Sequence, residues 1–117
     1  MSDSLENLRR RLAEFAAVRD WDQFHSPKNL AMALIAEAAE LVEHFQWLTE
    51  EQSQLLSTEK RQAVSYELAD VLIYLVRIAD KLDIDLIAAA KSKTEINETR
   101  YPAERVKGDA RRANEYI

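Results

Sequence analysis

The sequence contains no cysteine, one glycine and two prolines in 117 residues. Without cysteine, the chain can form no disulfide, no thiolate metal site and no cysteine nucleophile. So few glycines and prolines leave few breaker residues, which disfavours a sandwich or barrel of many short strands and favours long helices. The sequence also lacks a glycine-rich phosphate-binding loop, which excludes P-loop and dinucleotide-binding folds.

No apolar run approaches membrane-spanning length, and residues 1–4 contain no basic segment followed by an apolar one. We therefore expect neither a signal peptide nor a transmembrane helix, and no membrane partner. The absence of cysteine fits a cytoplasmic protein. The net charge of -5 argues against a nucleic-acid polymer as partner. With 47% hydrophobic and 32% charged residues, the chain has the composition of one soluble globular domain.

Apolar residues recur at helical spacing in several long segments, which predicts an all-α fold. The first helix is expected to have Asp3 as its N-cap and to end near Arg19. The second is expected to begin at Pro27, behind the N-cap Ser26, and to reach about Trp47.

A third helix is expected over about residues 59–82 with Thr58 as its cap. A fourth is expected over about residues 86–100, capped by Asp83 or Asp85. Together these segments predict a four-to-five-helix bundle. Because a chain of this size has a modest core of its own, we expect the bundle to be completed by oligomerisation.

The remaining segments define the expected organisation of the chain. Residues 49–57 are polar and are expected to form a connection. The fourth helix should end at residues 101–102, because a proline disfavours helical geometry in the residue before it. We therefore divide the chain into a helical domain, residues 1–102, and a charged C-terminal tail, residues 103–117, which either frays or forms a late helix.

A pair of acidic residues occurs twice, at the same position in two apolar helical segments. Glu37 and Glu40 form one pair, and Glu67 and Asp70 form the other. Residues three apart lie on the same side of a helix, so two such helices packed together would bring the carboxylates into one cavity. Two carboxylates about 4 Å apart repel by ~1 kcal/mol in water and ~4 kcal/mol at an effective dielectric near 20. The pattern therefore predicts a bound divalent cation.

One such pair alone would be an ordinary feature of an amphipathic helix. The repetition argues against that interpretation, as does the absence of a lysine or arginine four residues after any of the acids. Oxygen ligands favour Mg²⁺, Mn²⁺ or Ca²⁺. A carboxylate-bridged di-iron site would need a Glu-x-x-His motif on two helices. The residue three positions before His44 is Leu41 and not a glutamate, so iron is disfavoured.

Basic and aromatic residues complete the pattern of a nucleotide site. Lys93, Asn97 and Arg100 share one face of the fourth expected helix, which suits either an anion or a solvated surface. Aromatic side chains at the ends of the first two helices could pack in a core or stack on a nucleobase. These side chains are Trp21, Phe24, His25 and Trp47.

Several segments carry a resemblance to a known family. They are residues 19–30, 37–41, 45–47 and 67–75, followed by Lys93, Asn97 and residues 100–102. In this order and spacing they resemble the MazG-like all-α nucleoside triphosphate pyrophosphohydrolases, and within them the dCTP pyrophosphatase branch. The resemblance covers roughly residues 8–102.

The resemblance implies a helical homodimer or homotetramer that binds a nucleoside triphosphate. It implies cleavage between the α and β phosphates with Mg²⁺, or Mn²⁺ as a substitute, so that dCTP or a modified dCTP gives dCMP and pyrophosphate. The implied metal ligands are Glu37, Glu40, Glu67 and Asp70. The implied substrate contacts are Tyr74, Lys93, Asn97 and Arg100 for phosphate or sugar, and Trp21, His25 and Trp47 for the base.

Either Glu37 or Glu40 is the catalytic candidate that holds the attacking water, and the sequence leaves the choice open. Leu12 stands where animal dCTP pyrophosphatases place a histidine, a difference that bears on base selection. The connection between the acidic helices is also shorter here, and the tail has no counterpart. The alternatives are a preference for dUTP, dATP or a damaged nucleotide, or a non-catalytic module that binds a nucleotide or a metal.

Overall fold

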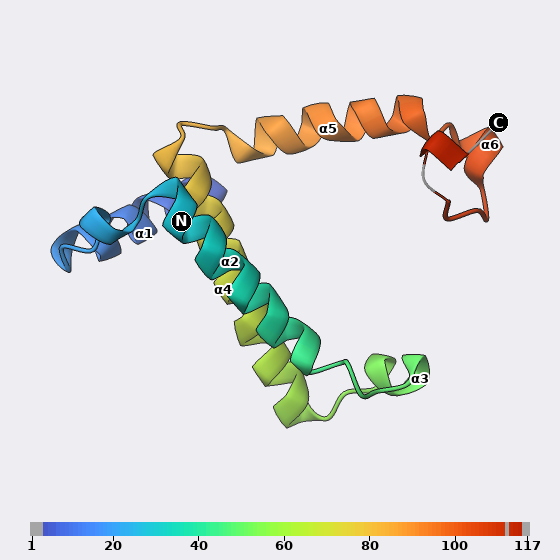
Figure 1. Ribbon diagram of the computed structural model, residues 1–117, viewed down its shortest axis with the longest axis horizontal. Coiled ribbons are helices and arrows are strands. Elements are labelled where there is room, and N and C mark those ends of the chain that lie inside the picture. The colour runs from blue at the N-terminus through green and yellow to red at the C-terminus, as the bar shows by residue number, and fades with distance from the viewer. Residues whose placement is uncertain (1–3, 112, 116–117) are drawn as a thin grey trace. The chain divides into compact units, whose positions relative to one another are not determined.

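The computed structural model describes residues 4–111 and 113–115, and in this part of the chain every regular element is helical (Figure 1). The predicted all-α class is therefore confirmed. The long helices are α1 (Leu5–Val18), α2 (Pro27–Glu43), α4 (Thr58–Lys81) and α5 (Leu86–Arg100). The short elements are α3 (Glu50–Gln54), α6 (Ala103–Val106) and the 3₁₀ turns Asp22–Phe24 and Ala113–Glu115.

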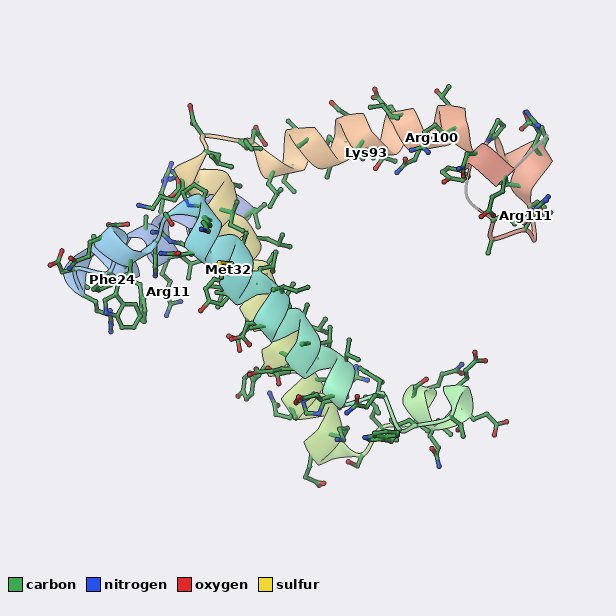
Figure 2. The ribbon with its side chains drawn as sticks, viewed as in Figure 1. Arg11, Phe24, Met32, Lys93, Arg100 and Arg111 are labelled. Carbon is green, nitrogen blue, oxygen red and sulfur yellow. The ribbon has the colours of Figure 1, made fainter. Side chains whose placement is uncertain are left out.

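The contacts within the chain form two compact units, Met1–Asp83 and Ile84–Ile117. In the first unit, α2 and α4 lie side by side along most of their length, and α1 packs against α4 (Figure 1). The second unit contains α5 and α6, and the side chains of Lys93 and Arg100 extend from α5 (Figure 2). No described helix combines the length and the hydrophobicity that crossing a lipid bilayer requires.

Short polar side chains fix where the helices begin. Ser26 caps α2 as predicted, with its Oγ accepting a hydrogen bond from the Asn29 N–H at 3.1 Å, and Asp85 caps α5. Two predicted caps are wrong by one residue. Ser4 caps α1 in place of Asp3, which lies outside the described residues, and Ser57 caps α4 in place of Thr58. In both helices a serine adjacent to the predicted cap satisfies the orphan N–H groups of the first turn.

The segment after α2 differs from the prediction. The helix ends at Glu43, and residues 44–47 form a tightened turn in which the Phe45 N–H bonds to the Val42 carbonyl at 2.9 Å. Within the expected connection, Thr49 and Gln52 form a reciprocal capping box that starts α3. This box provides local hydrogen bonds to a short polar segment that has no apolar periodicity.

The core of the described chain is small. Its buried apolar residues are Ala16, Leu30, Val64, Val76 and Ala79. Larger apolar side chains on α2 and α4 stay in contact with solvent, among them Ile35 at 68% exposure and Leu68 at 53%. Exposed apolar surface of this kind is typical of an interaction site. It is consistent with self-association, which stays a prediction.

Candidate metal and nucleotide site

Packing of α2 on α4 brings acidic residues of the two helices together. Glu37 from α2 and Glu67 and Asp70 from α4 each place one carboxylate oxygen within 4.8 Å of the other two. All three side chains are half-buried. Glu40 is exposed and interacts with Glu37 at the edge of this cluster. We call Glu37, Glu67 and Asp70 the acid cluster.

The electrostatics of the acid cluster suit a cation. Burial, followed by a hydrogen bond with Glu40 and the charges of Glu40, Asp70 and Glu67, raises the pKa of Glu37 from 4.5 to about 7. The Oε2 atom of Glu37 is buried and has no hydrogen-bond partner among the described residues. A buried acceptor without a donor, beside further carboxylates, matches a hard divalent ion with oxygen ligands such as Mg²⁺. The residues therefore fit the predicted metal.

Two basic side chains form a chain of hydrogen bonds that ends at Glu67 of the acid cluster. The Nε2 atom of His44 lies 3.3 Å from Oε2 of Glu67, and Nζ of Lys60 lies 3.3 Å from Nδ1 of His44. Because an ammonium group can only donate, Nδ1 accepts and the ring proton is on Nε2, which donates to Glu67. Such a contact orients a metal-ligating carboxylate. The sequence analysis missed Lys60, although it precedes Glu67 by two helical turns and so lies on the same face.

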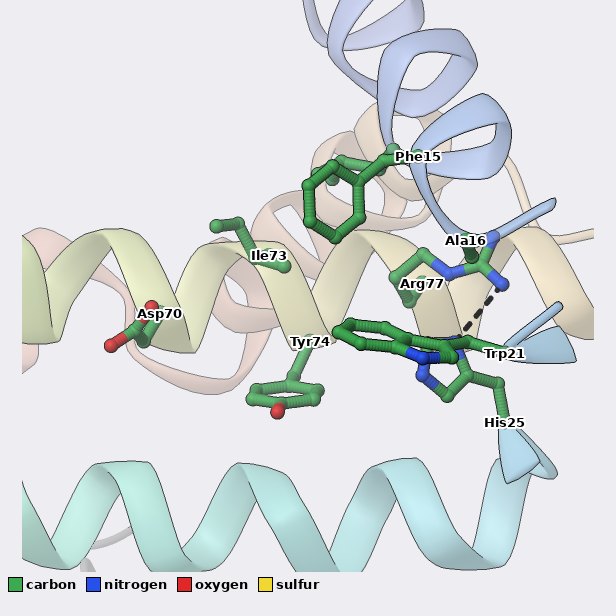
Figure 3. A pocket seen from close by; sticks show the side chains of 9 residues that line it. Phe15, Ala16, Trp21, His25, Asp70, Ile73, Tyr74 and Arg77 are labelled. Carbon is green, nitrogen blue, oxygen red and sulfur yellow. Dashed lines mark hydrogen bonds between the residues drawn. The ribbon is translucent and has the colours of Figure 1, made fainter. Parts of the chain in front are cut away.

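A cavity of about 230 Å³ opens beside the acid cluster (Figure 3). It is lined by Leu12, Phe15, Ala16, Trp21, His25, Asp70, Ile73, Tyr74 and Arg77. Trp21 meets Phe15 edge to face, with ring centroids 5.7 Å apart, and its centroid lies 6.3 Å from that of His25. The cavity is smaller than the ~300–1,000 Å³ typical of drug-sized ligand sites, so it suits one base rather than a whole nucleotide.

Asp70 belongs to both the acid cluster and the cavity. Tyr74, one turn further along α4, also lines the cavity, and burial followed by the charges of Glu37 and Asp70 raises its pKa. A molecule with a ring in the cavity and an anionic group held through a cation at the cluster would therefore bridge two adjacent sites. The structure thus places the acid cluster next to the aromatic cavity, and the sequence alone did not show that these two features are adjacent.

Arg77 is a lining residue that the sequence analysis did not select. Its side chain is buried, with the residue 4% exposed, and it lies between two carboxylates. Its Nη2 donates to Oδ1 of Asp22 at 2.8 Å, and its Nη1 donates to Oδ2 of Asp80 at 3.4 Å. Nη2 also lies 3.3 Å from Nδ1 of His25. The signal available in the sequence was a single basic residue within the apolar segment of residues 71–79, one turn after Tyr74.

Trp47 does not line this cavity and is 86% exposed. Trp21 precedes α2, whereas Trp47 follows it, and the 17 residues of α2 span about 26 Å. One chain therefore does not bring both tryptophans to the same base. The predicted role of Trp47 stays a prediction, and so do the phosphate contacts of the α5 residues. These are Lys93, Asn97 and Arg100, on a helix of the second compact unit.

The fold and this site define an all-helical protein with a carboxylate cluster beside an aromatic cavity. A sequence profile of the MazG-like family matches residues 33–115. The chain belongs to the MazG-like family.

Curated relatives and a solved structure agree with this assignment. The dCTP pyrophosphatase 1 of Homo sapiens is 48% identical over 114 residues, which cover 96% of this chain and 67% of the relative. The dCTP pyrophosphatase 1 of Mus musculus is 49% identical over 109 residues, which cover 92% of this chain and 64% of the relative. The chain thus spans about two thirds of the length of these relatives. The crystal structure of a pyrophosphatase from Archaeoglobus fulgidus matches with a TM-score of 0.78 and 42% identity, covering 87% of this chain and 95% of that one.

Proposed function

We propose that this chain hydrolyses dCTP, or a modified dCTP, to dCMP and pyrophosphate with the help of Mg²⁺. The observation that carries the proposal is the position of Asp70, which is shared by the acid cluster and by a cavity the size of one base. The names of the relatives, dCTP pyrophosphatase 1, supply the substrate. Glu40 completes the proposed metal ligands at the edge of the cluster.

Bound at these carboxylates, Mg²⁺ or Mn²⁺ would neutralise charge on the triphosphate and on the leaving pyrophosphate. Glu37 or Glu40 accepts a proton from the attacking water, whose oxygen forms a bond to the α-phosphorus. The bond between this phosphorus and the oxygen that bridges to the β-phosphate breaks, and pyrophosphate leaves. Glu40 is open to solvent and Glu37 is half-buried beside it, so both can meet such a water.

The remaining contacts divide between the base and the phosphates. Trp21 and His25 hold the base in the cavity, and Tyr74 contacts the sugar or a phosphate at its border with the acid cluster. We assign Lys93, Asn97 and Arg100 to the phosphates, because their shared face presents two cations and an amide. The active form is a homodimer or homotetramer, in which Trp47 of a second copy could reach the base.

A second candidate is the same reaction with another base. Leu12 lines the cavity at the position where the animal enzymes of the family are expected to have a histidine. Replacing a polar ring with an apolar side chain removes a hydrogen-bonding group from the base pocket, which favours a changed preference toward dUTP, dATP or a damaged nucleotide.

The decisive experiment measures the products formed from each common dNTP with and without Mg²⁺. We expect pyrophosphate and the nucleoside monophosphate, fastest with dCTP and only with the metal. The variants Glu37→Gln and Asp70→Asn should lose at least about a hundredfold in kcat, whereas Glu43→Gln, an exposed acid on α2 outside the cluster, should not. The proposal is wrong if folded Glu37→Gln and Asp70→Asn proteins hydrolyse dCTP at the wild-type rate.

A further inference from the structure

Charge balance alone does not explain why the guanidinium of Arg77 is buried between Asp22 and Asp80. Its carboxylate partners each hold another cation, since Lys81 donates to Asp22 at 2.9 Å and Arg9 donates to Asp80 at 3.0 Å. Neither carboxylate therefore depends on Arg77 alone for a counter-charge. The contact that no other described side chain provides is the one from Nη2 of Arg77 to Nδ1 of His25, at 3.3 Å.

This contact determines which nitrogen of His25 carries the proton. A guanidinium has only donors, so Nδ1 must offer its lone pair, and the proton of the neutral ring is on Nε2. A protonated ring would direct a second N–H at the guanidinium, which is unfavourable. Burial, followed by the charge of Arg77, accordingly lowers the pKa of His25. The ring thus stays neutral, with one fixed donor.

The donor lies in the cavity that we assign to the base. His25 and Arg77 both line it, and Figure 3 shows their hydrogen bond beside the Trp21 indole at the end of the cavity away from Asp70. Within residues 4–111 and 113–115, Nε2 of His25 has no hydrogen-bond partner. An N–H group in such a position favours a ligand with an acceptor there and disfavours one with a donor.

We infer that Arg77 is a specificity-determining positioning residue, which holds His25 as an Nε2–H donor to an acceptor atom on the base. The inference rests on the proposed function, which puts the base in this cavity. On cytosine the acceptor is O2 or N3, because the amino group at position 4 can only donate. Loss of Arg77 removes both the fixed tautomer and the contact that orients the ring, and should weaken binding by up to about tenfold, the equivalent of one hydrogen bond.

The test compares Arg77→Met with Lys81→Met. Arg77→Met removes the donor and keeps an apolar side chain of similar length, while Asp22 and Asp80 keep Lys81 and Arg9. Lys81→Met is the matched control, because it also removes a cation from Asp22 but has no hydrogen bond to His25. Arg77→Lys keeps a charged donor at the same position. If Arg77→Met does not fold, Arg77→Lys is compared with the wild type in its place.

The first measurement is the ¹⁵N NMR spectrum of the imidazole rings, which distinguishes the two tautomers. The chain has two histidines, so a His44→Gln variant assigns the spectrum. We expect His25 as the Nε2–H tautomer in the wild type and in Lys81→Met, and a mixture of tautomers in Arg77→Met. This measurement requires no turnover. An unchanged His25 ring in Arg77→Met would overturn the inference.

The second measurement is the calorimetric affinity for dCMP, for its 2-thio analogue, in which O2 is a weaker acceptor, and for its 3-deaza analogue, which lacks N3. In the wild type at least one analogue should bind about tenfold more weakly than dCMP, and that analogue identifies the acceptor. The difference should shrink in Arg77→Met and persist in Lys81→Met. Equal differences in all three proteins would refute the role of Arg77. Absence of pyrophosphate release would instead refute the proposed function, since dCMP binding is independent of catalysis.

Discussion

The Glu37 side chain has the properties of a metal ligand even without a bound metal. It has a buried oxygen without a partner and three acidic neighbours, and its pKa is raised from 4.5 to about 7. An acid with a raised pKa in the folded state holds its proton more tightly there than in the unfolded chain. Without a divalent ion, the folded state must therefore lose stability as the pH rises through the interval between these two values.

We predict that the free energy of unfolding in EDTA falls by on the order of 1–3 kcal/mol between pH 4.5 and pH 7 because of Glu37. Glu37→Gln, which cannot ionise, should reduce this fall and should be the more stable protein at pH 8. Urea unfolding at pH 5 and pH 8 measures the effect, with Glu43→Gln as the control. Equal pH profiles for the wild type and Glu37→Gln would contradict the electrostatic account.

We predict that Glu67 depends on His44 for its orientation. His44→Phe removes the Nε2–H donor 3.3 Å from Glu67 and leaves the carboxylate free to turn away. Loss of such an orienting contact weakens metal binding, here by roughly tenfold. Calorimetric titration with Mn²⁺ measures it, and His44→Gln, whose amide can donate, should recover part of the affinity. An unchanged Mn²⁺ affinity in folded His44→Phe would show that the contact has no orienting role.

The beginning of helix α4 allows a direct comparison between two adjacent hydroxyl residues. The Oγ atom of Ser57 accepts a hydrogen bond from the Lys60 N–H at 3.1 Å, and Thr58 is the first helical residue. Ser57→Ala should lower the free energy of unfolding by ~1 kcal/mol, and Thr58→Ala should change it by less than about 0.5 kcal/mol. Chemical unfolding of both variants checks this. The opposite order would restore Thr58 as the cap.

The helices and the acid cluster differ in how far the sequence could predict them. Three long helices, α1, α2 and α4, could be predicted from an apolar stripe of helical period, and α5 from its cap and the proline that follows it. The meeting of Glu37 with Glu67 and Asp70 followed from their position beside the stripes of α2 and α4. The cap positions and α3 depend on local hydrogen bonds that adjacent serines and threonines can make equally well. Arg77 could not be assigned, because its partners Asp22 and His25 are 55 and 52 positions away in the sequence.

A single copy of the chain buries little of its apolar surface. None of the buried residues in the described part is aromatic, and most are alanine or valine. Meanwhile Ile35 on α2 is 68% exposed and Leu68 on α4 is 53% exposed, although both helices are otherwise well packed against each other. Fully burying one such side chain contributes about 1.5–3 kcal/mol, so several of them covered by a second copy would add substantially to the stability of a small chain.

We therefore predict that the protein is a homodimer or homotetramer in solution and that Ile35→Glu weakens the assembly. A glutamate at an apolar contact between copies would have to lose its hydration without a partner, so dissociation should become detectable at micromolar concentration. Light scattering coupled to size-exclusion chromatography measures the mass. Lys28→Glu, an exposed residue on the same helix, is the control for added negative charge. A monomeric wild type would contradict the prediction, and an Ile35→Glu protein with the wild-type mass would place the contact elsewhere.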